Sequence, residues 1–200
     1  MGDRWPTQIQ REQLELRRAV PRDEGRALPE ANTPFRAQVA ALFDAHFQRL
    51  YRYMNRLSGE SDLASDVVQG AFVRLYLRGS LPDEPEAWLI SVAMNLFRNE
   101  KGTRSRRLRL LTADRGAWSL GDPPSSPEET VESGDARRQV RAALEKLPER
   151  DQQILLLHGE GYRYREISLA LKLNEASVGT LLARARRAFR RAYEELSSAP

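Results

Sequence analysis

The chain has 200 residues, 40% of them hydrophobic, which suits two small helical domains better than one large core. Lysine and arginine number 32 against 28 acidic residues, and the formal charge of +4 favours a polyanionic partner. The lack of cysteine excludes disulfides, thiol catalysis and cysteine-ligated zinc. Because no signal-peptide core or apolar run of about eighteen residues occurs, we expect a soluble cytoplasmic protein without membrane insertion.

Two segments lack helical periodicity. Residues 1–34 are polar and contain four prolines, which indicates a mobile N-terminal extension. Residues 113–135 contain three prolines and six acidic residues against one arginine, which indicates a flexible linker. A coil of that length spans on the order of 25 Å, enough to join two domains that contact separate DNA elements.

Three amphipathic helices are predicted in residues 35–112, the first of the two domains. Apolar residues recur at steps of three and four, and glycines break the pattern. The expected helices run from Phe35 to Gly59, from a cap at Ser61 or Asp62 to Gly79, and over residues 86–107. Phe72 and Trp88 fall among the apolar positions and are expected in the core.

A second helical domain is predicted over residues 136–200. Periodicity resumes at Asp135 and ends before Pro148, which disfavours a helical conformation of the preceding residue. A supporting helix, a glycine turn, a short helix up to Lys172 and a third helix that Asn174 can cap then form a helix-turn-helix pattern. The predicted fold class is all-α, with two small helical domains joined by a flexible linker and the C-terminal one a helix-turn-helix.

The third helix of this motif is predicted to contact DNA. Val178, Leu182, Ala185 and Phe189 fall on one face, which leaves the opposite face for a major groove. Polar residues near the helix start suit base edges, and the arginines further on suit phosphates. The candidates are Glu175, Ser177, Gly179, Thr180, Leu181, Arg184, Arg186 and Arg187. The alternative is a plain helical bundle with a solvated basic face.

Three motifs carry a resemblance to a known family. The segment LPERDQQILLLHGEGYRYREISLALKL is followed by SVGTLLARARRAF, SDLASDVVQGAFVRLY contains Asp-x-x-Gln-x-x-Phe, and EAWLISVAMNLFRNEKGTRSRR combines Trp-Leu with asparagines and arginines. Together they resemble the extracytoplasmic-function group of bacterial RNA polymerase sigma factors. Some departures are visible, since Gly70 stands where the family commonly has an acid and Lys172 where glycine is usual.

The resemblance assigns roles to residues of the first domain. It implies that Asp66, Gln69 and Arg74 bind core polymerase. It also implies that the loop 81–85 and the third helix capture the minus-ten promoter element as single-stranded DNA, which needs a basic track beside polar groups. The implied minus-ten residues are Asn95, Arg98, Asn99, Lys101, Arg104, Arg106 and Arg107.

The function implied is that of a sigma factor, which binds core RNA polymerase, directs it to specific promoters and assists strand opening. The helix-turn-helix would read the minus-thirty-five element. Core polymerase and promoter DNA are the expected partners, and an anti-sigma protein, which holds many relatives inactive, is a further one. Because promoter recognition would need both domains in complex with polymerase, we expect the isolated chain to bind DNA weakly.

Two other classes of function stay open. One is a helix-turn-helix transcription regulator that binds duplex DNA without engaging polymerase. The other is a nuclease, but only Glu100 and Asp114 lie near a basic block as candidate metal ligands. His46 and His158 lie on different predicted helices without a nucleophile nearby. We therefore expect no enzyme activity, catalytic residue, metal, cofactor or small-molecule substrate.

Overall fold

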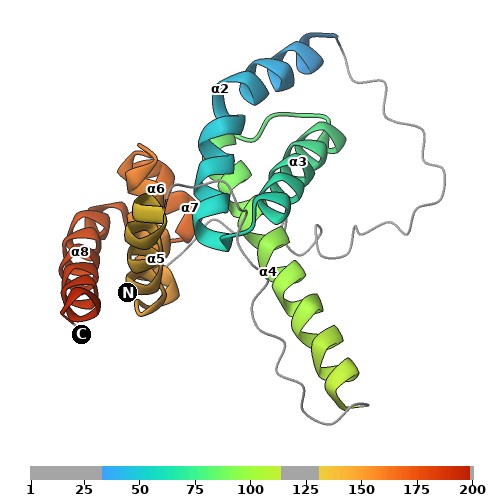
Figure 1. Cartoon of the computed structure of the whole chain (residues 1–200). Helices are drawn as coiled ribbons and strands as arrows, with labels where there is room; N and C mark the ends of the chain where they lie inside the picture. The colour runs from blue at the N-terminus through green and yellow to red at the C-terminus, as the bar shows by residue number, and fades with distance from the viewer. Residues whose placement is uncertain (1–32, 114–130, 199–200) are drawn as a thin grey trace, which may run out of the picture. The chain divides into compact units, whose positions relative to one another are not determined.

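The computed structural model describes residues 33–113 and 131–198, with the side chains of residues 34–104 and 136–198. Every element in these ranges is an α-helix, which confirms the all-α fold class (Figure 1). The helices are α2 (Thr33–Ser58), α3 (Ser61–Arg78), α4 (Pro85–Ala113), α5 (Val131–Glu145), α6 (Glu149–Gly159), α7 (Tyr164–Leu171) and α8 (Glu175–Ser197). The expected extension, apart from its last two residues, and most of the expected linker lie outside the described residues.

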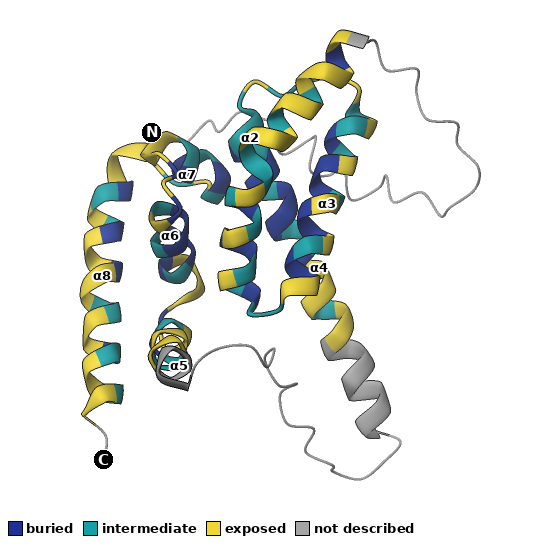
Figure 2. Ribbon diagram, turned by 45° about the horizontal axis from the view of Figure 1, so that its top comes forward, coloured by how far each residue is buried: buried dark blue, intermediate teal, exposed yellow. Residues whose placement is uncertain are grey.

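Helices α2, α3 and α4 pack together around an apolar core, and we call them the N-terminal unit. Leu50, Met54, Leu75 and Ile90 are fully buried, each contributing about 1.5–3 kcal/mol relative to an exposed position. Phe72 is buried too, as predicted, with its ring 5.0 Å from that of Phe43. In Figure 2 the buried residues of these helices lie on the sides where the helices face one another.

The breaks between these helices fall at glycines, as the sequence predicts. Gly59 and Gly79 have φ of 72° and 78°, a region in which a Cβ is disfavoured. The predicted cap of α3 was wrong by one residue, because the N-cap is Glu60 and its backbone exchanges hydrogen bonds with the Ser58 hydroxyl. Helix α4 runs six residues past its expected end, since no glycine or proline interrupts residues 103–113.

Helices α5 to α8 form the C-terminal unit, in which α6, α7 and α8 make the helix-turn-helix. Val178, Leu182 and Ala185 of α8 are buried, and Phe189 packs in a smaller cluster with α5, as the spacing predicts. The Asn174 side chain caps α8 by accepting a hydrogen bond of 3.0 Å from the backbone of Ala176. Helix α5 ends at Glu145, two residues earlier than expected, and a turn then leads to Pro148.

No described helix is both long enough and apolar enough to cross a lipid bilayer.

Lys172 ends α7 in a left-handed conformation, with φ 56° and ψ 50°. A side chain in this region costs about 1 kcal/mol, which glycine avoids. Lys172→Gly should therefore raise the free energy of unfolding by about 0.5–1 kcal/mol relative to Lys172→Ala. Both variants lose the lysine side chain, so the difference between their denaturant midpoints isolates the backbone. Equal midpoints would contradict the expected strain.

Candidate nucleic-acid interface

The start of α8 exposes most of the polar residues that the sequence assigns to DNA. Glu175, Ser177 and Thr180 are exposed on the first two turns, beside the Asn174 cap. Because the helix N-terminus also carries partial positive charge, this end suits a polyanion. The geometry is that of a recognition helix whose N-terminal residues can enter a groove.

Two of the candidates in α8 face inward instead. Leu181 is partly buried and packs against the apolar core. Gly179 lies beside Tyr164 of α7, whose ring would come within 3.5 Å of a Cβ at position 179. Tyr164 itself stays 42% exposed at the start of α7. The surface around Gly179 is therefore shared between α7 and α8.

The arginines of α8 divide into two groups. Arg184 donates a hydrogen bond of 2.7 Å to the buried carboxylate of Asp151 in α6. Arg186 lies 3.3 Å from Nδ1 of His158, also in α6. All five arginines of this stretch are exposed, but Arg187, Arg190 and Arg191, further along the helix, make no such contact with the described residues of α6. Spacing alone predicts the basic face but not which arginines contact α6.

Most of the predicted minus-ten residues of α4 are exposed, but the described cations among them contact other residues of the chain. Asn99 is exposed and Asn95 is half-buried. Arg98 is exposed but pairs with Glu149 of α6 at 3.3 Å. Two further cations have partners within the N-terminal unit, because Lys101 lies 5.0 Å from the Phe97 ring centre and Arg104 pairs with Glu60. The side chains of Arg106 and Arg107 lie outside the described part.

The loop 81–85, also predicted to contact the minus-ten element, lies against the C-terminal unit. Glu84 accepts hydrogen bonds from Arg165 of α7, the shorter one 2.6 Å long. Ser91 of α4 donates a bond of 3.2 Å to the backbone carbonyl of Ala170. The structure thus brings α7 onto the same surface as the predicted minus-ten residues.

The predicted polymerase-binding residues of α3 do not share one face. Asp66 and Gln69 are exposed on the outward side, and Gln69 donates a bond of 3.0 Å to Ser65. Arg74 lies eight positions after Asp66, which places it about 80° around the helix. It is half-buried, and burial lowers the pKa of its guanidinium.

Two apolar residues that the sequence reasoning missed complete the outward side of α3. Val73 and Leu77 are 56% and 51% exposed, seven and eleven positions after Asp66. These separations place both side chains within about 20° of Asp66 around the helix. Gly70 faces α4 instead, where a Cβ would lie 3.1 Å from Leu96, so the expected departure at this position serves close helix packing.

A polar cluster joins α2 and α4 to α7 and the turn before it. Arg49 pairs with Glu86 at 2.6 Å and lies 4.1 Å from the ring centre of Tyr162. Burial raises the pKa of Tyr162 to about 12. Glu86 also shares a hydrogen bond with the Glu166 carboxyl, and burial together with this bond raises the pKa of Glu166.

Glu160, at the end of α6, is the most deeply buried acid of this seam. Its side chain is 3% exposed, and its two oxygens meet Arg52 at 2.8 Å and Arg56 at 2.6 Å. Both arginines belong to α2 and remain about half exposed. A carboxylate removed from water needs such partners, so this contact fixes the end of α6 against α2.

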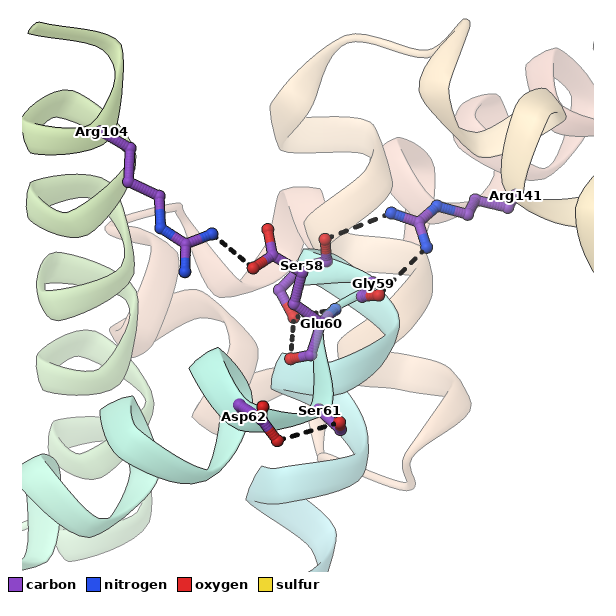
Figure 3. Close-up of polar contacts among 7 residues, drawn as sticks. All are labelled: Ser58, Gly59, Glu60, Ser61, Asp62, Arg104 and Arg141. Carbon is purple, nitrogen blue, oxygen red and sulfur yellow. Dashed lines mark hydrogen bonds and ion pairs between the residues drawn. The ribbon is translucent and has the colours of Figure 1, made fainter. Parts of the chain in front are cut away.

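The turn between α2 and α3 receives arginines from two other helices (Figure 3). Arg141 of α5 donates to the backbone carbonyls of Ser58 and Gly59, at 3.2 and 3.3 Å, while Arg104 of α4 pairs with Glu60. A Cβ at Gly59 would lie 1.7 Å from the Arg141 guanidinium. A side chain at position 59 would therefore displace the Arg141 guanidinium, and the φ of 72° favours glycine here as well.

Within the described residues, no three histidine, aspartate or glutamate side chains form a group that could hold a metal ion.

Comparisons with known proteins cover both units. The family model described as Sigma-70 region 2 matches residues 42–107, and that described as Sigma-70, region 4 matches residues 137–189. The chain is 30% identical over 165 residues to the ECF RNA polymerase sigma factor SigL of Mycobacterium tuberculosis, covering 80% of this chain and 91% of SigL.

Two further curated relatives carry the same description. SigE of Mycolicibacterium smegmatis is 31% identical over 149 residues, or 72% of this chain, and the match spans only 57% of SigE. EcfG of Rhodopseudomonas palustris is 33% identical over 140 residues, covering 66% of this chain and 70% of EcfG.

Two solved structures share the fold. One is the sigma factor RpoE in complex with the anti-sigma factor NepR from Bartonella quintana, with a TM-score of 0.55, 17% identity, and 82% of this chain and 98% of that chain covered. The other is CnrH in complex with the cytosolic domain of CnrY, with a TM-score of 0.56, 20% identity, and 83% and 99% covered.

The two arginines on Glu160 should show strongly non-additive effects on stability. Arg52→Ala or Arg56→Ala alone leaves the carboxylate one partner and should cost about 1 kcal/mol or less. The double variant leaves a buried charge unpaired and should cost about 3 kcal/mol or more. Denaturant unfolding of the four proteins measures the coupling. A double variant no worse than the sum of the single ones would contradict the importance of this buried charge.

Proposed function

Because the chain belongs to the extracytoplasmic-function RNA polymerase sigma factors, which direct core polymerase to promoters, we propose a division of labour between its two units. Residues 35–112 bind core polymerase and capture the minus-ten element. Residues 136–200 read the minus-thirty-five element. The protein works in the cytoplasm, at the nucleoid when active, and catalyses no reaction of its own.

The observation that carries this proposal is the outward face of α3. Asp66 and Gln69 continue along the helix into Val73 and Leu77, whose side chains remain more than half exposed. Apolar side chains in a row beside polar ones are typical of a surface that a partner covers. A regulator that binds only DNA has no need of this face, whereas a sigma factor needs it for polymerase.

Promoter contact is assigned to two surfaces of different chemistry. On α4, Asn95, Arg98 and Asn99 lie at i, i+3 and i+4, where amide groups can bond an unstacked base and the arginine a phosphate. On α8, the exposed start supplies polar side chains for base edges. Arg187 and the arginines after it suit the DNA backbone.

Contacts between the two units support weak DNA binding by the free chain. Glu149 pairs with Arg98, and Arg165 pairs with Glu84 of the loop 81–85. Both contacts occupy residues that the minus-ten element would need. Binding to core polymerase would have to separate them before DNA enters.

We also propose an anti-sigma protein as a partner. One solved neighbour is a sigma factor in complex with an anti-sigma factor, and the other is CnrH in complex with the cytosolic domain of CnrY. Such a partner would act here by covering the α3 face or by holding the two units together. Co-purification of the chain from its native host should recover it, and recovery of the free chain alone would count against it.

One experiment distinguishes the sigma factor from the alternative, a regulator that binds duplex DNA without engaging polymerase. Run-off transcription with core polymerase on a genomic promoter library tests polymerase binding, promoter reading and strand opening together. Specific transcripts would support the sigma assignment. Tight operator binding without any association with core polymerase would support the regulator.

Val73→Asp should weaken binding to core polymerase at least tenfold, because a charge on an apolar contact costs roughly 1.4 kcal/mol or more. The dissociation constant is measured by titrating labelled chain with core polymerase. Val140→Asp is the matched control, since Val140 is an exposed valine of α5 outside the proposed surface. Equal affinities of Val73→Asp and the control would contradict docking through α3.

Removing the acids that occupy the minus-ten surface should raise the DNA affinity of the free chain. Glu84→Gln/Glu149→Gln should bind a labelled single-stranded oligonucleotide several-fold more tightly, since exposed ion pairs contribute about 0.2–1 kcal/mol each. Glu194→Gln/Glu195→Gln removes the same charge from the end of α8, away from these pairs, and controls for net charge. If both double variants show the same increase in affinity for the oligonucleotide, the contacts between the units do not restrict DNA binding.

A further inference from the structure

A buried acid lies directly behind the proposed recognition helix. Asp151 is in the first turn of α6, and its side chain is only 5% exposed. Its partner is Arg184 of α8, whose Nη2 lies 2.7 Å from Oδ1 of Asp151. An unpaired carboxylate at such a depth would be strongly destabilising, so the bond with Arg184 is needed by the fold of this unit.

A second arginine contacts the other end of α6. Asp151 and His158 are seven residues apart (158 − 151), or roughly 10 Å along the helix axis. Arg184 and Arg186 are two residues apart and so project from nearly opposite sides of α8. Between them Ala185 is fully buried. The two arginines therefore reach opposite ends of α6 from either side of a buried contact.

Two contacts placed in this way restrain the rotation of α8 against α6 more than they restrain the distance between the two helices. Ala185 presents a small side chain, which leaves α8 free to pivot if only apolar contacts hold it. Contacts at both ends of α6 oppose that pivoting in either direction. Base readout needs donors and acceptors placed to within about 0.5 Å, so a small rotation of α8 would move Ser177 and Thr180 out of register.

We propose that Asp151 is a positioning residue for promoter recognition, and that Arg184 acts through it by fixing the angle of α8 rather than by reading bases. This rests on the function proposed above. Asp151 never meets DNA, yet it sets the sequence preference of the start of α8. Arg187, which is exposed one turn after Arg184, is the matched phosphate-binding residue.

The test compares Asp151→Asn, Arg184→Gln and Arg187→Gln in the full chain bound to core polymerase. The probe is a promoter library with a randomised upstream hexamer, and the retained DNA is sequenced. Asp151→Asn and Arg184→Gln should each reduce the enrichment of the preferred hexamer about tenfold. Arg187→Gln should weaken retention uniformly and leave the preferred hexamer unchanged.

Salt dependence separates positioning from phosphate contact. The affinity of the wild-type complex for its selected promoter falls with salt, and each lost phosphate contact reduces that slope by about 1. Arg187→Gln should show the reduced slope, and Asp151→Asn should keep the wild-type slope. The double variant Asp151→Asn/Arg184→Gln should reduce the enrichment of the preferred hexamer no more than either single variant does. A reduced slope in Arg184→Gln, together with wild-type preference in Asp151→Asn, would overturn the proposal.

A measurement without DNA tests the positioning role of Asp151 separately from promoter binding. Hydrogen exchange of the full chain should show at least tenfold faster exchange of α8 amides in Asp151→Asn and Arg184→Gln, with α2 and α3 unchanged. Arg184→Lys keeps the charge and should restore most of the protection. Unchanged exchange in α8 would overturn the positioning role. Failure of the wild-type chain to bind core polymerase would instead overturn the sigma assignment.

Discussion

Apolar residues of both units form one continuous buried core, and a buried negative charge at the end of α6 fixes one point where the units meet. The Glu160 carboxylate is 3% exposed and lies between Arg52 and Arg56, which leave α2 one turn apart. Because a charge at this depth is tolerated only with partners in place, the end of α6 is fixed to α2. Contacts of Arg49 with Tyr162 and of Arg165 with Glu84 join the same two units. The helix-turn-helix therefore lies on the proposed minus-ten surface of the free chain.

Local features of this fold could be read from the sequence, and contacts between distant residues could not. Glycine breaks, the Asn174 cap and the buried stripe of α8 depend on neighbours three or four positions away, so spacing alone predicts them. The bond of Arg184 to Asp151 and the pair of Arg98 with Glu149 join residues 33 and 51 positions apart. Such pairs depend on how whole helices pack. The sequence therefore predicts basic faces but not which of their arginines are occupied.

This division changes how a basic helix is interpreted. Arg184 to Arg191 contains five arginines and no acid, which suggests five phosphate contacts. Two of the five contact α6 instead, at Asp151 and His158. A prediction from composition alone would thus overestimate how steeply the DNA affinity falls with salt concentration. In the proposed function, the two arginines that contact α6 position the helix, and the remaining three are left to bind the DNA backbone.

The turn between α2 and α3 binds Arg104 on one side and Arg141 on the other, so the 36 residues from 105 to 140 start and finish at neighbouring points of the molecule. The number of residues between α4 and α5 hardly changes the free energy of the contact between the units, because doubling a closed loop costs only about 0.6 kcal/mol. Related proteins could lengthen or shorten this connection without losing the contact between the units. The spacing between promoter elements and the stability of the free chain can therefore change independently in evolution.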